Sequence, residues 1–250
     1  MIHLTIDYYK RFEIPLVVSL LKRFDESKDC ISFARGIPDP SIIPLDSIKK
    51  AADFVLNNNP YESLQYCPSQ GSSVFIDAVF DLESKKLKFL NKENIFTSIG
   101  SQGSFSRLCD ILLEKGDTVI TESPTYSAAI IEIRKHSANL FGVPFELKVN
   151  KSDGIDLNIL EDFLKKNKRV KFFYTIPENQ NPTSITTSLE KRINILTLAE
   201  RFGFFIIEDS PYMELTFDSQ KIPSYLEIGM ESDKVIGIRT FSKTITPGLR

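Results

Sequence analysis

Short apolar runs that alternate with helical segments constrain the fold of this chain more than any other feature. The runs VKFFYTIP (170–177) and FFIIED (204–209) are apolar at most positions and do not alternate with polar residues. Strands of this type are buried on both sides, which is typical of parallel sheets covered by helices on both faces. The sequence therefore predicts an α/β fold with a mainly parallel, or mixed, sheet and helices on both faces.

The alternation starts near residue 71 and places the expected elements. We expect helices where apolar residues recur with helical spacing, at 72–89, 101–117, 124–136, 157–167 and 188–203. We expect strands at 94–100, 118–123, 138–144, 170–177, 204–209 and 234–242. In the first helix Phe75, Ala78, Val79 and Leu82 share one face, which we expect to be buried. Ser188 is expected to cap the last helix.

Charge and cysteine content exclude several classes of protein. The chain has 31 basic and 33 acidic residues, so its formal charge of −2 gives no reason to expect nucleic acid or a membrane surface as a partner. Cys30, Cys67 and Cys109 are odd in number and widely spaced, which favours neither disulfides nor a metal site and fits the cytoplasm. No apolar run is long enough to span a bilayer, and the N-terminus carries charges where a secretory signal needs an apolar core.

Polar and aromatic residues follow five of the predicted strands. These turns are 100–103, 123–126, 178–181, 209–212 and 240–243. In parallel sheets, ligands bind beyond the carboxyl ends of the strands. The amides at 178–181 come directly after a buried strand and before Pro182, a position that can aim hydrogen-bonding groups at a ligand. We therefore expect the five turns to meet at one crevice.

The chemistry of these turns suits one kind of ligand. The turn at Ser101 and Gln102 opens a helix, and free N–H groups at a helix N-terminus bind phosphate. Tyr126 offers a flat ring, Asp209 a carboxylate and Lys243 an amine. A phosphate cradle, a stacking ring, a carboxylate and an amine together fit pyridoxal 5′-phosphate, a planar phosphorylated aldehyde.

Six ordered motifs resemble the class I/II aminotransferases, which are fold-type I pyridoxal-phosphate enzymes. The branch that is most similar includes aminoadipate-type aminotransferases and the aminotransferase-like domains of certain bacterial regulators. The resemblance implies the large domain of such a transferase and covers nearly the whole chain. The motifs are ISFARGIPDPSIIPLDSI, LQYCPSQG, IFTSIGSQGSFSRLCDILLEKGDTVITESPTY, IPENQNPTS, FFIIEDSPYMEL and RTFSKTITPGLR.

The resemblance implies roles for the residues that would surround the cofactor ring. Lys243 matches the lysine that bonds to the cofactor and moves the proton at the substrate Cα, and Asp209 matches the partner of the ring nitrogen. Asn181 and Tyr212 match the pair that holds the phenolic oxygen, and Tyr126 matches the ring that stacks on the pyridine. Lys243, Asp209 and Tyr212 are therefore the predicted catalytic residues.

Further contacts follow from the same resemblance. Tyr66 matches a tyrosine that reaches the phosphate of the neighbouring subunit, and Gly36 a backbone position near the substrate carboxylate. Ser184 stands where the family has glycine, which costs on the order of 1 kcal/mol if that position needs a positive φ. The expected phosphate ligands are Ser101, Gln102, Thr240 and Arg250.

The resemblance also implies a domain organisation and a reaction. Residues 1–60 are expected to form an N-terminal arm and part of a small domain, and 61–250 the cofactor-binding large domain, without the C-terminal small domain. The implied activity transfers an amino group between an amino acid and a 2-oxo acid, with a homodimer as the full-length form. The alternatives are another pyridoxal-phosphate reaction (lyase, decarboxylase or synthase), a non-catalytic cofactor-sensing module, or an inactive fragment.

Overall fold

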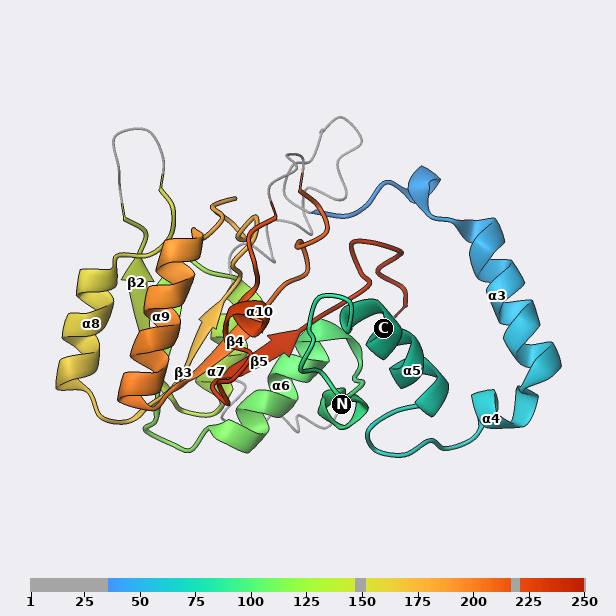
Figure 1. Ribbon diagram of the computed structural model, residues 1–250, viewed down its shortest axis with the longest axis horizontal. Coiled ribbons are helices and arrows are strands. Elements are labelled where there is room, and N and C mark those ends of the chain that lie inside the picture. Colours follow the sequence, from blue (N-terminus) through green and yellow to red (C-terminus); the bar gives the residue numbers. More distant parts are fainter. Residues whose placement is uncertain (1–35, 147–151, 217–220, 250) are drawn as a thin grey trace, which may run out of the picture. The chain divides into compact units, whose positions relative to one another are not determined.

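The computed structural model describes residues 36–146, 152–216 and 221–249 (Figure 1). The chain divides into two compact units, Met1–Ile43 and Pro44–Arg250. The described part of the first unit contains one short 3-10 helix, η1 (Pro40–Ile42), which begins where Asp39 accepts a hydrogen bond from the Ser41 N–H. The expected division at residue 60 into an arm and a large domain stays a prediction.

A five-stranded parallel sheet forms the centre of the second unit, with the order β2-β1-β3-β4-β5. All four strand pairings are parallel. This confirms the predicted α/β fold and its mainly parallel sheet. The strands are β1 (Thr118–Ser123), β2 (Asn139–Pro144), β3 (Val170–Thr175), β4 (Phe205–Asp209) and β5 (Val235–Ile238).

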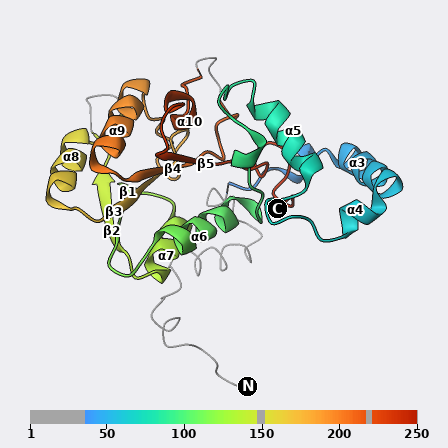
Figure 2. The same cartoon turned by 60° about the horizontal axis from the view of Figure 1, so that its bottom comes forward.

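Helices cover both faces of this sheet. Figure 2 shows α6 (Gly100–Leu112) and α7 (Ser127–Lys135) on one side of the strands. On the opposite side lie α8 (Leu157–Lys166), α9 (Leu189–Phe202) and α10 (Tyr225–Ile228). The elements that precede α6 in the chain are α3 (Leu45–Asn58), α4 (Pro60–Leu64), α5 (Ser73–Glu83) and η2 (Lys92–Asn94).

Each face of the sheet has its own hydrophobic core. Phe172 and Phe173 are neighbours on β3, so their side chains point to opposite faces, and both are almost completely buried. Phe172 packs in the cluster that includes Phe105 of α6, whereas Phe173 packs in the cluster that includes Leu160 of α8 and Ile195 of α9. Burial on both sides explains why the strand sequences show no apolar–polar alternation.

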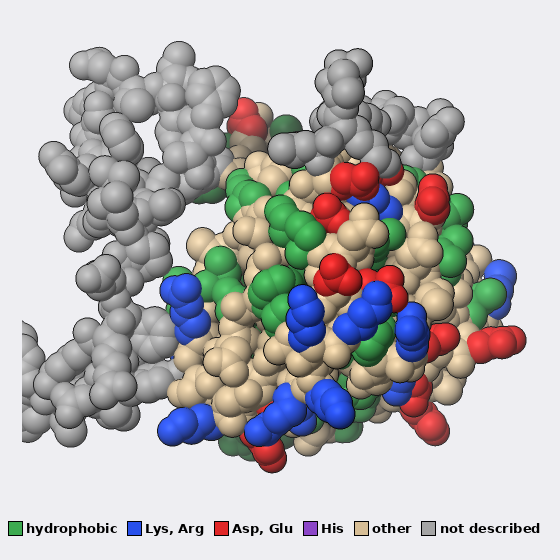
Figure 3. All heavy atoms as spheres, turned by 90° about the vertical axis from the view of Figure 1, so that its left-hand side faces the viewer, with side chains coloured by type: hydrophobic (Ala, Val, Ile, Leu, Met, Phe, Trp, Pro, Cys, Tyr) green, Lys and Arg blue, Asp and Glu red, His purple; other side chains and the backbone are tan. Residues whose placement is uncertain are grey.

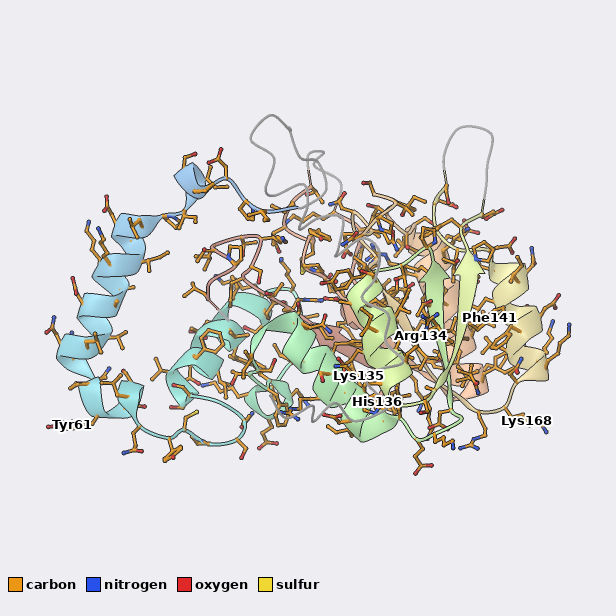
Figure 4. All side chains as sticks on the ribbon, turned by 180° about the vertical axis from the view of Figure 1, so that it is seen from behind. Tyr61, Arg134, Lys135, His136, Phe141 and Lys168 are labelled. Atoms are coloured by element: carbon orange, nitrogen blue, oxygen red, sulfur yellow. The ribbon has the colours of Figure 1, made fainter. Side chains whose placement is uncertain are left out.

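Helix ends and surface charges follow ordinary rules. The Ser188 side chain accepts a hydrogen bond from the Lys191 N–H and caps α9, as predicted. Figure 4 shows Arg134, Lys135 and His136 at the C-terminal end of α7, where positive charge complements the helix dipole. On the face drawn in Figure 3, Lys and Arg side chains lie beside Asp and Glu side chains. Ion pairs of α8 and α9 include Lys165–Glu161 (3.3 Å) and Arg201–Glu161 (3.1 Å).

The predicted strand at 94–100 is wrong. This segment joins η2 to α6 and its backbone pairs with a loop instead of with a neighbouring strand. The Thr97 N–H donates to Gln70 O at 2.8 Å, and Gln70 Nε2 donates to Lys92 O and Ile95 O. A short apolar run indicates extended backbone, but it does not reveal whether a neighbouring strand is available to complete a ladder.

The predicted inward face of α5 is also wrong. Phe75 and Leu82 are 44% and 51% exposed, while Ile76 is the buried residue of this helix. Phe80, four positions after Ile76, lies under the Lys92 ammonium at 5.6 Å from its ring centroid. The helical spacing of apolar residues therefore predicted the helix, but it did not predict which side of the helix packs against the rest of the fold.

Across the described parts of the chain, each helix is either too short or too polar to cross a membrane.

Candidate active site at the carboxyl end of the sheet

The turns that follow β3, β4 and β5 leave the sheet at the same edge. Asp209 is the last residue of β4 and lies beside Ile238, the last residue of β5. The Ser210 N–H extends this pairing by donating to Ile238 O at 3.1 Å. The parallel register therefore brings the Asp209 turn next to the segment that leads to Lys243. We expected these two turns to be neighbours because each follows a predicted strand of a parallel sheet.

Asp209 is a buried carboxylate with one oxygen held and the other left open. Its side-chain Oδ2 accepts a hydrogen bond from the Tyr174 hydroxyl at 2.7 Å. Its Oδ1 is buried and has no hydrogen-bond partner among the described residues. Burial raises the pKa of Asp209 to about 6, although the Tyr174 hydrogen bond and the positive charge of Arg239 oppose the rise. A buried oxygen without a donor is costly, so this atom marks a place for a ligand donor.

Tyr212 lies near this carboxylate and connects it to Asn181 and Tyr126. Burial raises the pKa of the Tyr212 phenol, and the nearby Asp209 and Tyr126 raise it further. A hydrogen bond with the Asn181 side chain lowers it and so ties the turn after β3 to the turn after β4. Tyr126 immediately precedes α7 and is half-buried against the core on that side of the sheet. The structure thus brings together four of the predicted ring-binding residues.

The first two amides of the turn after β3 hold it to other segments of the chain. Asn179 Nδ2 donates to Leu215 O at 3.2 Å, and Gln180 is 2% exposed with its side chain fully engaged. The third amide, Asn181, bonds the predicted ring-binding residue Tyr212. Ser184 has φ 59, which is the left-handed conformation that glycine adopts more easily than serine. The strain expected where serine replaces the glycine of the family is therefore present.

Glu122 is a second buried carboxyl near the site, and the sequence analysis did not identify it. It lies on β1 and accepts hydrogen bonds from Thr175 Oγ1 (2.6 Å), Gln180 Nε2 (2.9 Å) and the Ile176 N–H (3.4 Å). Burial raises its pKa to about 7, and these hydrogen bonds oppose the rise. The acidic residue in TVITES was the available signal, because a carboxylate inside a buried strand needs partners.

Arg192 anchors the start of the same turn from α9. Its guanidinium is fully buried and pairs with Glu178 Oε1 at 2.7 Å. It also donates to the carbonyl oxygens of Pro177, Thr187 and Pro223. An Arg whose donors are used in this way fixes the backbone around it, so the turn that carries Asn181 is held firmly on the side facing α9.

Three of the four predicted phosphate ligands are among the described residues and occupy the expected elements. Ser101 and Gln102 lie in the first turn of α6, whose N-cap residue Ile99 makes no side-chain capping bond. Thr240 follows β5; its Oγ1 donates to Ser242 Oγ at 2.9 Å and accepts from the Ser242 N–H. Arg250 lies outside the described residues. The phosphate-binding role of this group stays a prediction.

Three further predicted residues lie on segments other than the turns after β3 and β4. Lys243 is half-buried in the segment after β5. Tyr66 is 99% exposed, and the contact predicted for it is with a neighbouring subunit. Gly36 belongs to the other compact unit, and its position near the substrate carboxylate stays a prediction.

Comparison with known proteins identifies the family. The sequence profile described as aminotransferase class I and II matches residues 28–250. The chain belongs to this family. An uncharacterized aminotransferase of Saccharolobus solfataricus is 35% identical over 235 residues, a match that covers 92% of this chain and 57% of the relative.

Solved aminotransferase structures share the fold. A kynurenine aminotransferase of Pyrococcus horikoshii has a TM-score of 0.89 and 27% identity, over 98% of this chain and 60% of that chain. An α-aminoadipate aminotransferase of Thermus thermophilus has a TM-score of 0.84 and 30% identity, over 98% of this chain and 59% of that chain. The chain therefore spans about three fifths of the length of these class I and II aminotransferases.

The site fits the cofactor that this aminotransferase family implies. The Pyrococcus structure was determined with PMP, and the Thermus structure with N-(5′-phosphopyridoxyl)-L-leucine. In the described part of the present chain, Asp209 Oδ1 has no hydrogen-bond partner, and a buried carboxylate oxygen of this kind is an acceptor that suits a protonated ring nitrogen. The residues present therefore fit pyridoxal phosphate.

Proposed function

We propose that this chain is the cofactor-binding large domain of a pyridoxal-phosphate-dependent aminotransferase that moves an amino group between an amino acid and a 2-oxo acid. The observation that carries the proposal is the buried Asp209 carboxylate, with Oδ2 held by Tyr174 and Oδ1 open. Membership of the aminotransferase family gives this geometry its chemical meaning.

Each residue of the cluster has a part that suits its position. Asp209 Oδ1 would accept a hydrogen bond from the protonated ring nitrogen. The hydrogen bond from Tyr174 favours the ionised form of that carboxylate and holds it in place. Tyr212 and Asn181, which already bond each other, would donate to the phenolic oxygen. Tyr126 would cover one face of the ring. When bound, the cofactor withdraws electrons from the substrate Cα.

Lys243 would hold the aldehyde carbon of the cofactor and then carry the proton at the substrate Cα. Its half-buried position in the segment after β5 suits an amine that works at the cofactor. Ser101, Gln102, Thr240 and Arg250 would hold the phosphate.

The assembly and the substrates are proposed from the relatives. We propose an amino acid and a 2-oxo acid as substrates, a homodimer in which Tyr66 reaches the neighbouring site, and Gly36 beside the substrate carboxylate. The free cysteines Cys67 and Cys109 are compatible with a cytoplasmic protein. Nothing in the described residues favours another pyridoxal-phosphate reaction or a non-catalytic sensing module.

Reductive labelling tests the proposal. The chain is incubated with pyridoxal phosphate and treated with borohydride, which reduces the carbon–nitrogen double bond to the lysine, and the modified peptide is then mapped. We expect the label on Lys243, its loss in Lys243→Ala, and unchanged labelling in Lys221→Ala, a lysine paired with Glu214 at the surface. A label on another lysine, or one spread over many, refutes the proposed site.

A further inference from the structure

We propose that Gln180 and Glu122 form a brace that locks the turn carrying Asn181 to the turn carrying Tyr126. The pair would thereby position two cofactor-contacting residues that lie on different strands. This inference rests on the proposed function only where it names the cofactor; the brace itself is a property of the chain.

The Gln180 amide uses its whole hydrogen-bonding capacity. Its Oε1 accepts from the Thr183 N–H (2.9 Å) and the Thr183 hydroxyl (2.7 Å), which closes the turn that contains Asn181. Its Nε2 donates to Glu122 Oε2 (2.9 Å) and to Pro124 O (2.9 Å). An amide offers two donors and two acceptor sites, so every one is occupied.

Glu122 fixes the other end of the brace to the sheet. Its Oε1 accepts from Thr175 Oγ1 and its Oε2 from Gln180 and the Ile176 N–H. Glu122 belongs to β1 and Thr175 to β3, which are neighbouring parallel strands. The carboxylate therefore receives donors from β3 and from the turn that follows it, while it sits on β1.

The hydrogen bond from Gln180 Nε2 to Pro124 O extends the brace to the turn that carries Tyr126. Pro124 lies two positions before Tyr126, and Gln180 lies directly before Asn181. One side chain therefore contacts the backbone next to the predicted stacking ring and the backbone next to the predicted phenolic-oxygen donor. If the amide is lost, both residues lose a restraint at the same time.

Each hydrogen bond of the brace has a fixed donor and a fixed acceptor, so exchanging the two side chains tests it. Pro124 O and ionised Glu122 can only accept, and the Thr183 N–H can only donate. Gln180→Glu would place a second carboxylate against Glu122 and against Pro124 O. Exchanging the two residues, Gln180→Glu with Glu122→Gln, returns one amide donor to the pair and so restores the contact in reverse.

The test has a readout that needs no cofactor. Hydrogen exchange of the free chain is measured in segments 178–186 and 123–130 for the wild type, Gln180→Glu, the exchanged double variant and Thr183→Val. We expect Gln180→Glu to speed exchange about tenfold in both segments, in line with the loss of about one charge-assisted hydrogen bond. Thr183→Val removes two hydrogen bonds, both inside the turn: the one from the Thr183 hydroxyl to Gln180 Oε1 and the one from the Ile185 N–H to the Thr183 hydroxyl. It should therefore affect 178–186 alone, and the double variant should recover part of the protection.

A second readout addresses positioning. We expect Gln180→Glu to weaken pyridoxal-phosphate binding about tenfold and to shift the pH midpoint of the bound cofactor's visible absorption, with partial recovery in the double variant. If Gln180→Glu does not fold, Gln180→Met replaces it. Unchanged exchange in 123–130, or a double variant no better than the single one, overturns the brace. Failure of the wild-type chain to bind the cofactor counts against the proposed function and leaves the exchange result to decide the brace.

Discussion

At the scale of single residues, the site depends on two carboxyl groups that burial would neutralise if they had no donors. Burial raises the pKa of Asp209 to about 6 and that of Glu122 to about 7, and in each case a neutral hydrogen-bond donor opposes the rise. Tyr174 does this for Asp209, and Thr175 followed by Gln180 does it for Glu122. These donors favour the charged form of Asp209, which is proposed to contact the cofactor, and of Glu122, which holds the turn that carries Asn181.

Replacing Tyr174 tests this role. Tyr174→Phe removes the donor at 2.7 Å, so the pKa of Asp209 is expected to rise above about 6 by about one further unit, since such a bond to a charged group contributes about 1.5–3 kcal/mol. The measurement is an NMR titration of aspartate-labelled chain without cofactor. Tyr225→Phe is the matched control, because the Tyr225 hydroxyl is buried with no hydrogen-bond partner among the described residues. Equal Asp209 titration in Tyr174→Phe and wild type would contradict the prediction.

At the scale of elements, sequence pattern located the central strands but not every partner. The runs at 118–123, 170–177 and 204–209 match β1, β3 and β4 closely, because strands buried on both faces have an unmistakable composition. The segment 94–100 failed because strand formation depends on a neighbour, and α5 failed because its buried stripe depends on what it packs against. Tyr174 and Glu122 were missed for a related reason: their partners lie on other strands, and register cannot be read from one strand.

The turn after β3 carries a backbone strain that one substitution should relieve. Ser184 has φ 59, so Ser184→Gly is expected to raise the free energy of unfolding by about 0.5–1 kcal/mol, measured by urea denaturation. Ser137→Gly is the control, since Ser137 has φ 55 in a turn after α7. Both variants should gain similar stability; a loss in Ser184→Gly alone would mean that the serine side chain contributes to the turn.

At the scale of the whole molecule, a buried carboxyl couples stability to pH. The folded-state pKa of Glu122 is about 7, above its ordinary value of 4.5, so the folded chain binds this proton more tightly than the unfolded chain. The stability contributed by this proton is therefore complete below about pH 4.5 and is lost as pH rises through about 7.

Comparison of wild type with Glu122→Gln across this window isolates the effect. The free energy of unfolding of the wild type should fall with rising pH more steeply than that of Glu122→Gln, which has no proton to lose. Urea denaturation without cofactor, at several pH values between about 4.5 and 7, provides the measurement. Parallel curves for the two proteins would show that Glu122 titrates with its unfolded-state pKa.

The separate cores above and below the sheet have a consequence for how such a chain can evolve. The interior layers around Phe172 and Phe173 hold the sheet and its helices together, whereas the proposed cofactor contacts come from a few side chains where the strands end. Substitutions at the strand ends can change which ligand is bound without disturbing the buried layers. One fold can therefore acquire different ligand specificities while its core residues stay the same.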